Sequence, residues 1–114
     1  MPSPRSVGSE SENRVAEWLR ERGLLILATR YKKGIGEVDL VALESETVVF
    51  IEVKRRAKLQ KVTEDLIDPT KLKRIRSTAE SFMHEFGLTG REARIDVVFD
   101  LKSGIKWVKD VVVP

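Results

Sequence analysis

Gly36-Glu37-Val38-Asp39-Leu40-Val41-Ala42-Leu43 and Thr47-Val48-Val49-Phe50-Ile51-Glu52-Val53-Lys54 are two apolar, β-branched segments joined by Glu44-Ser45-Glu46. Residues of this kind favour strands, and a polar connection of three residues has the length of a hairpin loop. The stretch therefore predicts a β-hairpin over residues 36–54, around which the rest of the chain is organised.

Charged residues lie within both arms of this hairpin. Because side chains alternate between the faces of a strand, Glu37 and Asp39 share one face of the first arm. Glu52 and Lys54 share a face of the second arm with Phe50, an expected core residue. Carboxylates held close together repel each other, and a hard cation between them would offset that repulsion. Asp39 and Glu52 are therefore candidate ligands of Mg²⁺ or Mn²⁺; the alternative is a hairpin whose charged face is simply solvated.

Composition narrows the class of protein. A chain of 114 residues, 41% hydrophobic and 34% charged, is expected to form one soluble domain. It has no cysteine, which excludes disulfides and thiol chemistry, and its single histidine leaves oxygen as the main metal ligand. The start of the chain does not resemble a secretory signal, and no apolar run is long enough to cross a membrane, so we expect a cytoplasmic protein.

The net charge of +3 is unevenly distributed. The segment 54–76 carries nine Lys or Arg residues against three acids, a balance of +6, so the rest of the chain sums to −3. A basic band beside a carboxylate cluster indicates that a polyanion is brought to a metal, and nucleic acid is the commonest polyanion. A solvated charged surface explains the charge equally well.

The remaining elements follow from local patterns. Residues 1–7 are expected to be a loose tail, and residues 8–114 a single domain. We predict helices over about 10–22 and 69–86, further strands over 24–29, 94–101 and 105–113, and basic loops over 30–36 and 55–61. The second helix has Asp68 as N-cap and Pro69 at its first position. The order αβββαββ predicts an α/β fold with a mixed five-stranded sheet flanked by helices.

Several polar residues allow two interpretations. Glu12 is either the third residue of a Ser9-x-x-Glu12 capping box or a metal ligand that projects toward the hairpin. Glu37 is either a ligand or a partner of the basic turn through Arg30 or Lys33. Lys71 is either a phosphate contact or a solvated helix residue. Among the residues with a structural explanation, Asp96 could pair with a neighbouring arginine, and Trp18 and Trp107 are expected to pack.

These motifs together resemble the bacterial YraN-type family, whose members are predicted endonucleases related to archaeal Holliday-junction resolvases. The resemblance runs from Gly8 to Val98. It rests on Gly8-x3-Glu12-x3-Ala16-x2-Leu19, Gly36-Glu37-Val38-Asp39, Phe50-Ile51-Glu52-Val53-Lys54-x-Arg56, the helical Lys71 and Arg94-Ile95-Asp96-Val97-Val98. It implies the restriction-endonuclease-like PD-(D/E)xK fold. It also implies a helix-1 glutamate at Glu12, a catalytic aspartate at Asp39, and the Glu-x-Lys pair at Glu52 and Lys54.

Three hypotheses of different classes follow. The first is a Mg²⁺- or Mn²⁺-dependent DNA endonuclease of repair or recombination, acting on branched or flapped DNA and compatible with a homodimer. The second is a catalytically silent DNA-binding or adaptor module on the same fold, and the third is a protein-interaction domain. The first explains why Asp39, Glu52 and Lys54 all occur together. Its expected DNA contacts are Arg30, Lys32, Lys33, Arg55, Arg56, Lys58, Lys71, Lys73 and Arg74.

Overall fold

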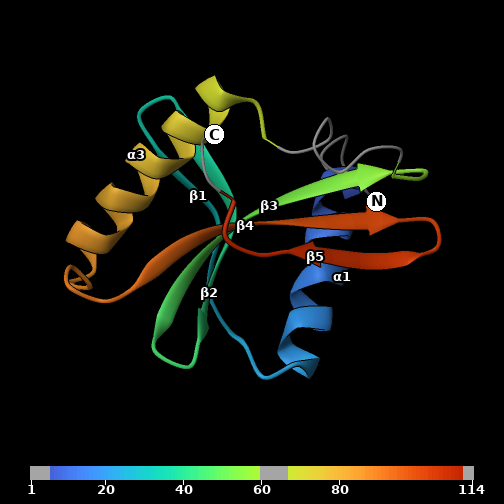
Figure 1. The fold of residues 1–114 in the computed structure, drawn as a ribbon, viewed down its shortest axis with the longest axis horizontal. Coiled ribbons are helices and arrows are strands. Elements are labelled where there is room, and N and C mark those ends of the chain that lie inside the picture. Colours follow the sequence, from blue (N-terminus) through green and yellow to red (C-terminus); the bar gives the residue numbers. More distant parts are fainter. Residues whose placement is uncertain (1–5, 60–66, 112–114) are drawn as a thin grey trace.

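The computed structural model describes residues 6–59 and 67–111. Within these two ranges, two helices and five strands follow one another in the predicted order (Figure 1). The elements are α1 (Ser6–Glu21), β1 (Leu25–Lys33), β2 (Gly36–Glu44), β3 (Thr47–Arg56), α3 (Pro69–Glu85), β4 (Ala93–Leu101) and β5 (Gly104–Val108). In the described part of the chain, no helix is long and apolar enough to span a membrane.

The five strands form one mixed sheet in the order β1-β2-β3-β4-β5. β1 with β2, β2 with β3, and β4 with β5 are antiparallel hairpins, while β3 and β4 are parallel. The parallel pair requires a crossover, and α3 lies in that connection between β3 and β4. The predicted α/β class and mixed sheet are confirmed.

Each helix buries an apolar stripe against one face of the sheet. Val15, Ala16 and Leu19 of α1 belong to a buried cluster with Leu40 and Ile51. The core on the other face has its own helix: α3 contributes Leu72, Ile75, Ala79 and Phe82 to a cluster that includes Val41, Phe50 and Phe99. The sheet is thus the central layer, with α1 and α3 on opposite sides (Figure 1).

β2 and β3 separate partway along the sheet. Their pairing begins at Glu44↔Thr47 and ends at Leu40↔Ile51. Beyond that point β2 stays with β1 as far as Gly36, while β3 stays with β4 as far as Arg56 (Figure 1). We call this point the strand split. It opens one end of the sheet between its two halves.

At the turn end of the β2–β3 hairpin, a buried polar network links β2 to β4 and β5. The Asp96 carboxylate is fully buried, and it accepts hydrogen bonds from Arg94 Nε at 3.0 Å, Trp107 Nε1 at 2.8 Å and the Asp110 backbone N–H at 2.8 Å. Arg94 also donates to Glu44 at 2.6 Å. The predicted pairing of Asp96 with an arginine is confirmed. Asp96 is therefore satisfied by structural partners and needs no catalytic role.

The first helix begins earlier than predicted. α1 begins at Ser6, so Ser6 and Val7 are helical rather than part of a loose tail, and residues 1–5 lie outside the described part. Ser9 consequently lies inside the helix, and the capping-box interpretation of Glu12 is wrong. Tertiary contacts orient this turn instead, because Ser11 donates to Asp100 and Glu12 accepts from Arg30.

Other element boundaries also shift. β1 continues through the predicted basic turn to Lys33, because Tyr31 packs edge-on against Phe82 with ring centroids 5.0 Å apart. β3 likewise extends to Arg56, so part of the predicted basic loop is strand, and residues 60–66 lie outside the described part. β5 ends at Val108, before Asp110 adopts a positive φ of 58°, and residues 112–114 are not described. α3 ends at Glu85, and Phe86 is its C-cap and is 54% exposed.

Gly36 provides a test of how α3 packs on the sheet. A Cβ at this position would lie 1.9 Å from Thr78 Oγ1 and 3.2 Å from the Arg74 carbonyl oxygen. We predict that Gly36→Ala lowers the free energy of unfolding by about 1–3 kcal/mol through overpacking. Adding Thr78→Ala should restore part of that loss, as measured by denaturant unfolding of both single variants and the double variant. Equal destabilisation with and without Thr78 would contradict this packing.

Candidate functional site

Two carboxylates meet where the strands separate. Asp39 lies on β2 and Glu52 on β3, each directly beyond the last β2–β3 pair, Leu40↔Ile51. Asp39 Oδ2 accepts a hydrogen bond of 2.8 Å from the Val53 backbone N–H. The Asp39 side chain thus accepts the hydrogen bond that a backbone carbonyl of β2 would accept if the two strands were still paired at this point. The hairpin periodicity placed Glu52 on the core face, and this residue is indeed 7% exposed.

The close approach of Glu52 changes the protonation of Asp39. Burial, followed by a hydrogen bond with Glu52 and the charge of Glu52, raises the pKa of Asp39 to about 8. The Val53 N–H acts the opposite way and lowers the pKa. Without a metal ion, Asp39 therefore retains its proton at neutral pH.

Other buried aspartates in the sheet have different partners. Asp96 is paired with Arg94, and Asp100 with Arg14 at 2.5 Å. In both cases a neighbouring cation stabilises the buried negative charge. Asp39 instead has a second carboxylate, Glu52, as its neighbour. Two neighbouring carboxylates in a buried position lower the folding stability unless a cation neutralises their charge. Such an arrangement is typical of a functional site.

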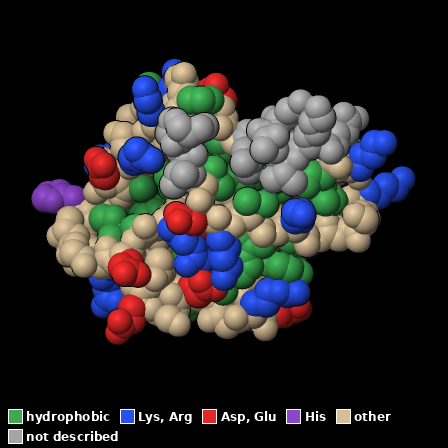
Figure 2. Space-filling model, in the orientation of Figure 1, with side chains coloured by type: hydrophobic (Ala, Val, Ile, Leu, Met, Phe, Trp, Pro, Cys, Tyr) green, Lys and Arg blue, Asp and Glu red, His purple; other side chains and the backbone are tan. Residues whose placement is uncertain are grey.

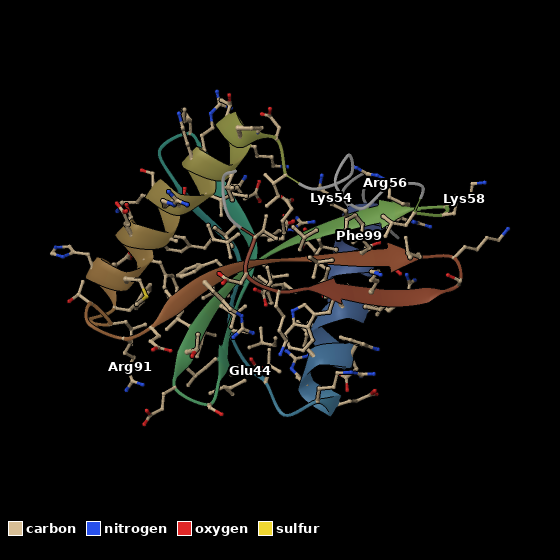
Figure 3. The ribbon with its side chains drawn as sticks, in the orientation of Figure 1. Glu44, Lys54, Arg56, Lys58, Arg91 and Phe99 are labelled. Atoms are coloured by element: carbon tan, nitrogen blue, oxygen red, sulfur yellow. The ribbon has the colours of Figure 1, made fainter. Side chains whose placement is uncertain are left out.

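Two lysines accompany the pair. Lys71, near the start of α3, places its Nζ 3.0 Å from Glu52 Oε2. From the sequence, Lys71 was interpreted as either a phosphate contact or a solvated helix residue. Its ion pair with Glu52 was missed because residue spacing does not show how α3 lies relative to β3. Lys54 lies two residues beyond Glu52 on β3 and is partly buried (Figure 3). It is therefore on the same face of the strand as Glu52.

Glu12 and Glu37 lie outside the immediate pair. Glu12 Oε2 accepts from Arg30 Nε at 2.9 Å, and the hydrogen bond with Glu12 raises the pKa of Arg30. The negative charge of Glu12 still reaches Asp39, where it contributes to the raised pKa. Glu37 is exposed and opposite Lys32 in the β1–β2 register. Arg30, expected to contact DNA, is thus engaged by a site residue.

The carboxylates of Asp39 and Glu52 fit a magnesium or manganese ion that takes its remaining ligands from outside this pair. Residues 10–59 and 67–111 contain no group of three or more His, Asp or Glu side chains arranged to hold a metal. Asp39 and Glu52 supply two carboxyl groups in contact, and a metal ion would replace the proton on Asp39. Mg²⁺ is commonly held by one or two carboxylates together with water and substrate phosphates.

A basic groove lies beside this site. Two adjoining hollows of about 430 and 450 Å³ run between the β1–β2 turn and α3 and share Ile35, Gly36 and Arg74. The first also includes Lys71, which links it to Glu52. We call this the α3 groove; its cationic and hydroxyl lining residues are Lys33, Lys71, Lys73, Arg74, Thr70, Ser77, Thr78 and Ser81.

The predicted DNA contacts therefore fall into separate regions. Lys33, Lys71, Lys73 and Arg74 line the α3 groove. Arg30 and Lys32 lie on β1, and the remaining three lie at or just beyond the end of β3 (Figure 3). That last set consists of Arg55, Arg56 and Lys58. The hydroxyl residues of the groove, Ser77 and Ser81, were missed because serines on a helix carry no distinguishing pattern.

The raised pKa of Asp39 predicts how stability depends on pH. Without metal, the folded protein keeps a proton from pH 3.8 to about 8 that an unfolded aspartate has released. Stability contributed by this proton is complete below pH 3.8 and is lost as pH rises through about 8. Asp39→Asn can still accept from Val53 and donate to Glu52. Its melting temperature in EDTA should therefore exceed that of the wild type by more at pH 8 than at pH 5. An equal difference at both pH values would contradict the raised pKa of Asp39.

A solved structure has the same fold. A Holliday junction resolvase from Archaeoglobus fulgidus, an archaeal hyperthermophile, superimposes with a TM-score of 0.58, covering 89% of this chain and 75% of that one. The two are 19% identical in sequence. At this identity the likeness shows the fold, and the predicted restriction-endonuclease-like architecture is confirmed.

Sequence relatives cover most of the chain. It is 42% identical over 91 residues to a UPF0102 protein of Erythrobacter litoralis, an alignment that spans 80% of this chain and 78% of that protein. It is 37% identical over 105 residues to a UPF0102 protein of Lachnoclostridium phytofermentans, spanning 90% and 89%. The family model itself matches residues 11–99. The family membership predicted from the motifs is thereby confirmed: this chain belongs to the uncharacterised protein family UPF0102.

Proposed function

We propose that this protein is a divalent-metal-dependent endonuclease that cuts DNA. The observation that carries the proposal is the contact between Asp39 and Glu52 at the strand split, where two partly or fully buried carboxylates have each other as neighbours. The α3 groove, lined by cations, opens beside them. A cation-binding carboxylate pair next to a basic groove is suited to hydrolysis of a phosphodiester.

Asp39 and Glu52 would hold Mg²⁺ or Mn²⁺. When bound, such an ion lowers the pKa of a water ligand and polarises a phosphate oxygen. Lys54 follows Glu52 on the same face of β3, where its ammonium group can orient a water molecule and offset negative charge on the phosphoryl oxygens. Glu12 contributes through its charge and through the ion pair that fixes Arg30. Glu37 remains a candidate additional ligand at the rim.

The α3 groove is the proposed path of the DNA. Three of its cations, Lys71, Lys73 and Arg74, lie on the first half of α3, where cations oppose the helix dipole and do not favour the helix. Phosphate contacts explain their position. Lys71 contacts Glu52 and lines the groove at the same time, so it connects the backbone-binding surface with the carboxylates.

The solved neighbour is a Holliday junction resolvase, which suggests branched DNA as the substrate class. A junction presents two equivalent strands, and a two-fold homodimer would supply one site to each. We therefore propose branched or flapped DNA as the preferred substrate, and a pair of subunits as the active form. Repair and recombination in the cytoplasm are the processes that produce such DNA.

One observation favours a second candidate, a silent DNA-binding module. The ammonium group of Lys71 neutralises Glu52 without any metal ion. If that ion pair persists in solution, the site is filled by a protein cation and cleavage does not follow. The two candidates differ in whether a divalent ion displaces Lys71.

Thermal unfolding separates them. Mn²⁺ at 100 times its Kd should stabilise the wild type by about 2.7 kcal/mol through linkage, and Asp39→Ala should abolish this stabilisation. Lys71→Ala should enlarge the shift at a fixed subsaturating Mn²⁺ concentration, because a competing cation has been removed from Glu52. Lys73→Ala is the matched control, since Lys73 is two residues away and exposed. If Mn²⁺ stabilises Asp39→Ala as much as it stabilises the wild type, the ion binds at another position.

Cleavage is tested with Lys54→Ala. We expect this variant to bind four-way junction DNA and Mn²⁺ as the wild type does, yet to cut at least ~100-fold more slowly, since charge developing on the phosphate loses its positive neighbour. The measurements are single-turnover cleavage on a sequencing gel and filter binding under the same conditions. Unchanged cleavage in Lys54→Ala would show that Lys54 has no part in the chemistry. A wild type that binds but never cuts junction, flap or duplex DNA would favour the silent module.

A further inference from the structure

A second basic hollow lies at the end of β3, distinct from the α3 groove. Its volume is about 400 Å³, and we call it the β3-end pocket. It is formed where the parallel strands β3 and β4 end, at the register pairs Arg55↔Asp100 and Arg56↔Leu101. α1 contributes Arg14, and the turn after β4 contributes Lys102. Basic side chains project from this end of the molecule (Figures 2 and 3).

A buried carboxylate fixes one wall of this pocket. Asp100 is 5% exposed, and its Oδ2 accepts from Ser11 Oγ at 2.8 Å and from Arg14 Nη1 at 2.5 Å. The Arg14 side chain is nevertheless 54% exposed, so donors of its guanidinium remain available to a ligand. Holding an arginine in place before a ligand arrives reduces the entropy lost on binding.

Cations outnumber acids among the described residues that line the pocket. These are Arg14, Arg55, Arg56 and Lys102 against the single carboxylate of Asp100, a formal charge of +3 for the described lining. Within the described residues, neither Arg55 nor Lys102 forms an ion pair. A solvated surface would spread such charges apart. Here three separate segments bring them to one hollow, an arrangement that favours an anion.

We propose that the β3-end pocket binds a backbone phosphate of the DNA strand held at the carboxylates. This inference rests on the proposed function and extends it. Arg56 lies four residues beyond Glu52 on one continuous strand, a span of about 13 Å. A stacked DNA strand covers that distance in about four nucleotides at ~3.4 Å axial rise each. The pocket is thus a second anchor that sets the position of the strand relative to the scissile phosphate.

The test begins with inorganic phosphate as the probe. Phosphate is titrated at constant ionic strength while backbone amide chemical shifts are followed, and the shifts should concentrate at residues 55–57 and 100–102. Arg55→Ala combined with Lys102→Ala should abolish them, and this double variant spares the Arg14–Asp100 pair that stabilises the fold. The control is Arg91→Ala with Lys106→Ala, which removes two exposed charges outside the pocket. Shifts absent from the pocket, or unchanged in the pocket variant, would overturn the proposal.

DNA binding then assigns the anion. The pocket variant should bind duplex and junction DNA more weakly than the control variant. The slope of log affinity against log salt should fall by about 0.9 for each DNA phosphate that the variant no longer neutralises. Equal slopes for the two variants would overturn the assignment to DNA. If the wild type binds no DNA but phosphate still shifts the pocket, the proposed function fails separately, and the pocket is a site for a free phosphate compound.

Discussion

The hydrogen bond from the Val53 N–H to Asp39 is the interaction on which the site depends. Beyond Leu40↔Ile51, β2 remains paired with β1 and β3 remains paired with β4, so the two halves of the sheet separate. A backbone donor at that point needs a new acceptor, and the Asp39 carboxylate supplies it at 2.8 Å. The same bond directs Asp39 toward Glu52. Sheet topology and site geometry therefore have one cause.

The separation also explains the distribution of charge. Burial and the contact with Glu52 disfavour the ionised form of Asp39, a cost that the fold does not incur at Asp96 or Asp100, where arginines are neighbours. Lys71 offsets part of this cost at Glu52. The site is in this sense prepared for an additional positive charge. Two basic hollows supplement that charge: the α3 groove reaches Glu52 through Lys71, and the β3-end pocket lies farther along β3.

The fold and the carboxylate pair could be predicted because both rest on short-range patterns. Period-two alternation placed Glu52 on the core face, and the N-cap Asp68 with Pro69 located the start of α3. Long-range contacts could not be predicted in this way. These contacts depend on how the helices pack on the sheet, and local residue spacing does not predict that packing. Examples are the Lys71–Glu52 ion pair, the Arg30–Glu12 ion pair and the proximity of Arg14 to Lys102.

The central claim is that Asp39 and Glu52 form a divalent-cation site. Anomalous scattering from crystals soaked in Mn²⁺ tests this most directly. The account predicts one peak about 2.0–2.2 Å from an oxygen of each carboxylate, which are bonding distances for a hard divalent cation of this size, with the Lys71 ammonium group moved off Glu52. A map without a peak at the strand split, in which Lys71 still contacts Glu52, would contradict it.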